Sequence, residues 1–132
     1  MASRLELILK ELNENGNFRA SLFSTSTGLV LASQKEDGVD ERVVAAMGSL
    51  LSEAAIKAAE ELDLSEADVM KLFYRKDYII CRNIHMSDNK TNFLLAVLSK
   101  SPESNDVEKY FDQLLDWAVE NSHADLEKLS SI

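Results

Sequence analysis

Residues 40–62 constrain this chain more than any other segment, because they predict a long helix with apolar or small side chains on two sides. Asp40 is a good N-cap for it. At about 100° per residue, the larger apolar residues form one broad stripe, which we expect to lie on a sheet. That stripe is Val43, Val44, Met47, Leu50, Leu51, Ala54, Ala55, Ala58 and Leu62. Nearly opposite runs a second line of mostly small residues: Ala45, Gly48, Ser49, Ser52, Ile56 and Ala59.

A helix that only covers a sheet needs the first stripe alone, so the second line calls for another explanation. Small residues let another backbone approach closely, and Gly48 in mid-helix costs about 0.5–1 kcal/mol relative to alanine. A matching helix from a second copy, crossing at a two-fold axis, would explain both features. The alternative is that alanine is simply a good helix former and the line faces water. We favour the dimer contact.

The other elements follow from local patterns. Ser3 and Glu6 form a capping box for a first helix that ends near Gly16. Strands are predicted at 18–24, 29–33, 68–75, 78–84 and 92–99, and a last helix at about 105–129 with Asn105 as its capping residue. Hairpin-length links within each run of strands predict an antiparallel sheet. Because two strands are apolar on both faces, helices should cover both sides, giving a three-layer α/β fold of order α-ββ-α-βββ-α.

Charge and composition exclude several classes of partner. A formal net charge of −9 disfavours nucleic acid and anionic lipid, and the chain lacks an apolar run long enough for membrane insertion. No secretion signal is recognised, so we expect a cytoplasmic protein and treat the glycosylation pattern that starts at Asn89 as chance. The last helix carries eight acidic and two basic residues between 103 and 128. A solvated helix face is favoured there over a docking surface for a basic partner.

The sequence contains no recognisable catalytic, metal-binding or cofactor-binding motif. Cys81, His85 and His123 lack the paired spacing of metal ligands. Cys81 shares a strand face with Ile79, which favours a buried, inert thiol over a nucleophile. We therefore expect no enzyme, no metal and no cofactor.

For two sets of side chains, the sequence is compatible with a structural role and with a binding role. Trp117 is either the edge of a core or an interface anchor. Arg75, Lys76 and Arg82 either protect a sheet edge from aggregation or meet a partner, and the first role is favoured.

Three stretches together resemble the Roadblock family: residues 26–33 (STGLVLAS), 40–47 (DERVVAAM) and 58–62 (AAEEL). The resemblance implies a profilin-like roadblock fold, with the middle helix on one face of a five-stranded sheet and the terminal helices on the other. It implies a single roadblock-type domain over residues 1–132, in which the last helix is longer than in minimal members. It also implies a dimer with itself or with a paralogous roadblock subunit. In that dimer the second helices pack together and the third strands extend the sheet, which adds Val69, Lys71 and Phe73 to the candidate contacts.

The family's usual role implies the function. Roadblock proteins scaffold or regulate small Ras-like GTPases, or serve as adaptor subunits of signalling and motor complexes, so we expect a non-catalytic dimeric scaffold. No arginine is identifiable as a catalytic finger, so an effect on GTP hydrolysis would act through the partner's own groups. The alternative is a ligand-sensing domain of the PAS or GAF type. Such a sensor needs a cavity, whereas the apolar strand faces here look filled.

Overall fold

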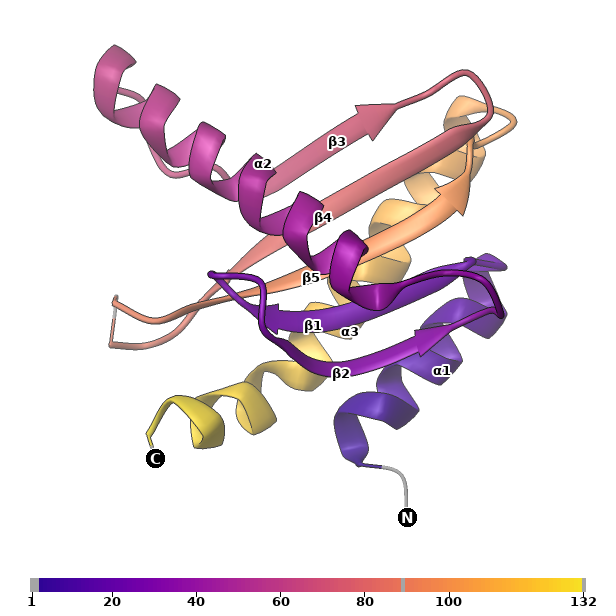
Figure 1. The fold of residues 1–132 in the computed structure, drawn as a ribbon, viewed down its shortest axis with the longest axis horizontal. Helices are drawn as coiled ribbons and strands as arrows, with labels where there is room; N and C mark the ends of the chain where they lie inside the picture. Colours follow the sequence, from indigo (N-terminus) through magenta and orange to yellow (C-terminus); the bar gives the residue numbers. More distant parts are fainter. Residues whose placement is uncertain (1–2, 89, 132) are drawn as a thin grey trace.

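A five-stranded antiparallel sheet lies between two helical layers in the computed structural model, which describes residues 3–88 and 90–131. The elements are α1 (Arg4–Gly16), β1 (Ala20–Thr25), β2 (Val30–Lys35), α2 (Glu41–Leu62), β3 (Val69–Phe73), β4 (Asp77–His85), β5 (Asn92–Lys100) and α3 (Asn105–Ser130). The strands lie in the order β2-β1-β5-β4-β3. Figure 1 shows α2 on one face of the sheet and α1 and α3 on the other. The predicted fold class and element order are confirmed.

Local capping explains where the helices begin and end. The Ser3 hydroxyl accepts a hydrogen bond from the Glu6 amide, and the Asp40 carboxylate accepts one from the Arg42 amide. The predicted cap of α3 was one residue late. Ser104 is the N-cap, because its hydroxyl accepts from the Val107 amide at 3.2 Å.

The two faces of the sheet pack differently. Large side chains such as Leu12, Phe23 and Leu95 fill the space beneath α1 and α3. The core beneath α2 combines the small residues Ala20, Cys81 and Ala96 with larger ones such as Leu22 and Ile79. A single helix can approach a surface of small side chains closely, and this determines which side of α2 is buried.

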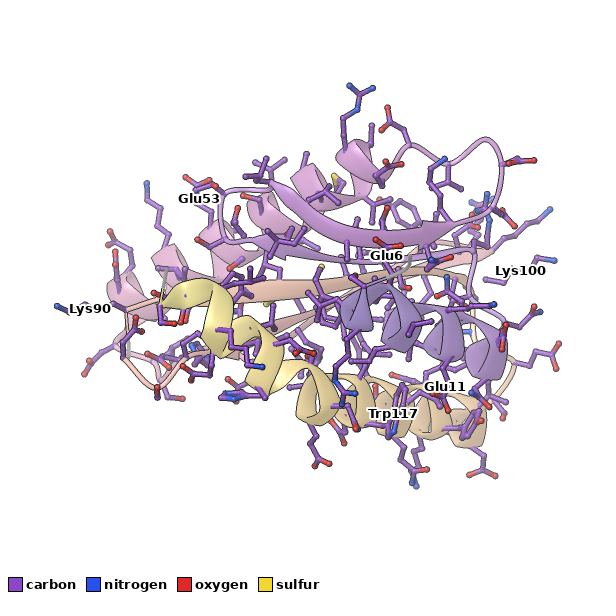
Figure 2. The ribbon with its side chains drawn as sticks, turned by 90° about the horizontal axis from the view of Figure 1, so that it is seen from below. Glu6, Glu11, Glu53, Lys90, Lys100 and Trp117 are labelled. Carbon is purple, nitrogen blue, oxygen red and sulfur yellow. The ribbon has the colours of Figure 1, made fainter. Side chains whose placement is uncertain are left out.

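The part of α3 beyond Trp117 is anchored to the rest of the molecule. Leu126 is fully buried in the same core as Met86, and the Glu127 carboxylate accepts hydrogen bonds from the Ser87 amide and hydroxyl at 2.8 and 3.1 Å. Trp117 is half-buried against this core, which favours the core-edge role (Figure 2). The additional turns therefore hold the turn between β4 and β5 in place. None of the helices in the described ranges is long and apolar enough to cross a membrane.

Candidate protein-protein interface

The small-residue line of α2 lies on the sheet, so the assignment of its two sides was wrong for three residues. Ala45 and Ser52 are buried, and Ser52 donates a hydrogen bond to the Asn83 side chain at 3.0 Å. Gly48 faces the sheet as well. A Cβ atom built on it would lie 3.2 Å from the Cys81 sulfur and 3.6 Å from the Ala96 Cβ. These residues let α2 approach its own sheet, and they are not available to a second copy.

Several of the larger apolar residues of α2 are left outside, although Val44 is buried against the sheet as predicted. Leu50 is 60% exposed and Leu62 is 67% exposed, and Val43 is exposed to a similar degree. We call the set Val43, Met47, Leu50, Ala54 and Leu62 the apolar flank of α2. Beside it, Leu51, Met70 and Leu72 are half-buried at the border of the α2 core. Several large apolar side chains exposed along one helix are typical of a protein interface.

The remaining candidates on α2 face away from the apolar flank. The Ser49 hydroxyl donates to the Ser26 carbonyl at 2.9 Å, which fastens the turn between β1 and β2 to the helix. Ile56 is exposed and Ala59 is half-buried, and both line a cleft beside the ends of β4 and β5. These residues therefore lie apart from the apolar flank.

Strand β3 forms one edge of the sheet. Within the part of the chain that the structure describes, β3 pairs only with β4, so its outer backbone groups can accept a further strand. Val69 and Phe73 are exposed at this edge, and the Phe73 ring stacks on Tyr78 with ring centroids 4.6 Å apart. These two predicted contacts remain accessible.

Lys71 is engaged within its own chain. Its ammonium donates to the Glu108 and Asp112 carboxylates of α3, at 2.8 and 3.1 Å. Burial alone would lower the pKa of Lys71, but these two hydrogen bonds outweigh it and raise the pKa above its ordinary value. Burial also raises the pKa of Tyr78 to about 12, so the phenol stays neutral beside them. The Lys71 ammonium therefore links β3 to α3 within the chain, and the predicted dimer contact of Lys71 stays a prediction.

The acidic face of α3 forms ion pairs within the chain. This role differs from both sequence interpretations, a solvated face and a docking surface. Besides Glu108 and Asp112, Asp116 pairs with Arg82 at 2.7 Å and Asp125 pairs with Arg4 at 3.0 Å. Several of its carboxylates thus connect α3 to β3, β4 and α1. Arg82 accordingly belongs to an ion pair under the sheet rather than to an exposed basic cluster.

The described side chains carry little reactive chemistry. Burial raises the pKa of the Cys81 thiol to about 12, so it is uncharged at neutral pH and poorly nucleophilic. His85 is the last residue of β4, and its ring lies 3.3 Å from the Asp68 carboxylate. No group of three or more His, Cys, Asp or Glu side chains among the described residues is arranged to hold a metal ion.

Comparison with known proteins identifies the fold. No family model matches the sequence, and neither does any curated protein. Among solved structures, a Roadblock/LC7 domain from Streptomyces avermitilis is 16% identical with a TM-score of 0.79, covering 94% of this chain and 98% of that one. MglB from Myxococcus xanthus is 13% identical with a TM-score of 0.76, covering 98% and 96%. The gliding protein MglB from Thermus thermophilus is 12% identical with a TM-score of 0.72, covering 92% and 90%.

This chain therefore has the roadblock fold over nearly its whole length. In particular, it is similar to the bacterial MglB structures. The similarity supports the roadblock fold predicted from the sequence.

Proposed function

We propose that this chain is a non-catalytic, dimeric, roadblock-type scaffold that regulates a small Ras-like GTPase. The observation that carries the proposal is the apolar flank of α2, which remains exposed beside the free edge of β3. Covering both with a second copy would bury apolar area and satisfy the edge backbone groups together. A paralogous roadblock subunit could provide the same surfaces in a heterodimer.

Two further observations support self-association. In an antiparallel pair of α2 helices, the negative end of each helix dipole would meet the positive end of the other, which is favourable. A similar MglB structure is described as having a tetrameric arrangement. Both favour self-association.

The GTPase partner is inferred from the Roadblock resemblance. The net charge of −9 suits a protein partner better than nucleic acid or an anionic membrane surface. Without an identifiable arginine finger, regulation would consist of positioning the groups that the GTPase itself supplies. The protein would act as a binding platform with no turnover of its own.

Solution mass tests the dimer surface. We expect the wild-type chain to have twice its monomer mass of 14.7 kDa in analytical ultracentrifugation, and Leu50→Glu to sediment as a folded monomer. Leu7→Glu is the matched control, since Leu7 is 54% exposed but lies on α1 on the other face of the sheet. A dimer that tolerates Leu50→Glu, or that is lost equally with Leu7→Glu, would contradict the assigned surface.

Pull-down with the small GTPases of the same organism tests the partner. The GTPases are loaded with GDP or with a non-hydrolysable GTP analogue and offered to the wild-type protein. Binding to at least one GTPase, with a preference for one nucleotide state, is the expected result. Binding to none in either state would refute the GTPase assignment but would not affect the proposed dimer surface.

A further inference from the structure

A cleft of about 460 Å³ lies between the last turns of α2, the segment that follows it, and the ends of β4 and β5. Ile56 and Ala59 contribute an apolar wall from α2, and Leu64, which is 59% exposed, contributes another from the following segment. The segment passes behind the end of α2 before entering β3 (Figure 1). The cleft is therefore wide enough for a side chain and partly apolar inside.

Hydrogen bonds hold the walls of this cleft in place. The Asn83 side chain donates to the Ala67 carbonyl at 2.6 Å, and the Asn83 amide donates to the Asp68 carbonyl at 2.9 Å. At the base, His85 Nδ1 lies 2.8 Å from the Asn92 side-chain oxygen. A site fixed in this way loses little conformational freedom on binding, which favours recognition of a ligand.

The rim of the cleft is acidic. Glu60, Asp63 and Glu66 line it, and its lining contains no lysine or arginine. The last turn of α2 also has no basic residue, so these carboxylates add to the negative end of the helix dipole. Among the described residues the one ion-pair partner of Glu66 is the His85 ring, at 3.5 Å, whereas carboxylates of α3 pair with Lys71 and Arg82. Negative charge is thus left uncompensated around an apolar interior.

We propose that this cleft binds a short segment of a partner protein in which an apolar side chain is flanked by lysine or arginine. The apolar side chain enters between Ile56 and Leu64, and the flanking cations meet Glu60 and Glu66. Charge complementarity identifies the occupant, because an anionic ligand would be repelled and a purely apolar one would leave the rim unpaired.

This inference is independent of the proposed dimer. Ile56 and Glu60 are four residues apart and share one flank of α2, whereas Leu50 and Ala54 lie on the apolar flank. A monomeric Leu50→Glu protein should therefore still bind the basic segment. The two proposals can fail separately.

Titration of the full chain with a fluorescent heptapeptide tests the cleft. The peptide has a central leucine flanked by lysine and arginine, with glycine and serine elsewhere. We expect binding that weakens as salt is added, with amide NMR shifts that concentrate on residues of the cleft. Replacing the central leucine of the peptide by serine should abolish measurable binding.

Matched variants identify the contacts. Glu60→Gln and Glu66→Gln should each weaken binding roughly two- to fivefold, the ordinary range for one exposed charge pair. Glu53→Gln is the control, because it makes the same charge change on an exposed part of α2 outside the cleft (Figure 2). Leu64→Ser should weaken binding without changing the solution mass.

Three results would overturn the proposal. One is an equal loss of affinity in Glu53→Gln and Glu60→Gln, which would show only a general attraction to negative charge. Another is unchanged affinity of the peptide that lacks leucine. The third is NMR shifts that lie on another face of the molecule.

Discussion

Substitution of Gly48 by alanine tests which side of α2 lies on the sheet. In a solvent-exposed helix interior, this change stabilises a protein by about 0.5–1 kcal/mol, because alanine loses less backbone freedom on folding. Here the new Cβ atom would lie 3.2 Å from the Cys81 sulfur, so that side chain or the helix must move by a few tenths of an ångström. Such overpacking costs about 1 kcal/mol or more. We therefore expect Gly48→Ala to have little net effect on the free energy of unfolding.

Removing the Cys81 sulfur should reveal the stabilisation by Gly48→Ala that overpacking otherwise cancels. In a Cys81→Ala background the nearest remaining neighbour of the new Cβ is the Ala96 Cβ at 3.6 Å, which is an ordinary van der Waals contact. Gly48→Ala should then stabilise by the full amount of about 0.5–1 kcal/mol. The double-mutant cycle should accordingly give a coupling energy of about 1 kcal/mol between positions 48 and 81.

The assay is urea unfolding of the four proteins at one fixed concentration, because dimerisation makes apparent stability depend on concentration. Equal stabilisation by Gly48→Ala with and without the Cys81 sulfur would refute the reasoning, since it would place Gly48 away from the sheet. Gly48→Glu is a stronger test of the burial of position 48. It should unfold the chain rather than release an intact monomer, because it would bury an unpaired carboxylate.

Three further results are expected. Cys81, buried and with its thiol pKa raised to about 12, should resist iodoacetamide in the native protein and react after unfolding; rapid labelling of folded protein would contradict its burial. Hydrogen bonds from the Thr91 and Lys90 amides lower the pKa of Asp88, so its contribution to stability should be present above the ordinary carboxyl pKa of about 3.9 and lost as pH falls through the lowered value. Asp88→Asn should flatten that part of the pH profile of the thermal midpoint, and an unchanged profile would exclude this role. Leu126→Ala should cost about 2–5 kcal/mol in urea unfolding if the end of α3 belongs to the core, whereas a loss below 0.5 kcal/mol, roughly the limit for surface substitutions, would show that it does not.

The sequence predicted the features that depend on local chemistry. The caps at Ser3 and Asp40 fixed the starts of two helices, and short links between strands fixed their antiparallel pairing. Alternation placed Cys81 inside beside Ile79. These inferences need only neighbouring residues, which is why they were confirmed.

The orientation of α2 could not be obtained in the same way. Both sides of the helix lack charge, so periodicity alone does not distinguish the side that faces the sheet. The distinguishing signal lay elsewhere in the chain, in the small side chains of Ala20, Cys81 and Ala96 on the facing strands. The small side chains opposite Gly48 let the helix backbone approach the sheet, and close packing then leaves little room for a larger residue at that position.

The acidic face of α3 shows a second limit. Its carboxylates pair with Lys71 and Arg82, which are far away in the sequence and come close only when the sheet forms. Charge counting along the helix therefore predicted a solvated surface. The same distant contacts link Lys71 to α3 within the chain.

Cross-linking between two α2 helices tests the central claim most directly. Ala54→Cys places a thiol on the apolar flank, while the native Cys81 stays buried and unreactive. With a short bis-maleimide, we predict a covalent species of twice 14.7 kDa from Ala54→Cys and none from Leu7→Cys, which is exposed on α1. Equal cross-linking at both positions, or none at Ala54→Cys, would contradict a dimer built on the apolar flank of α2.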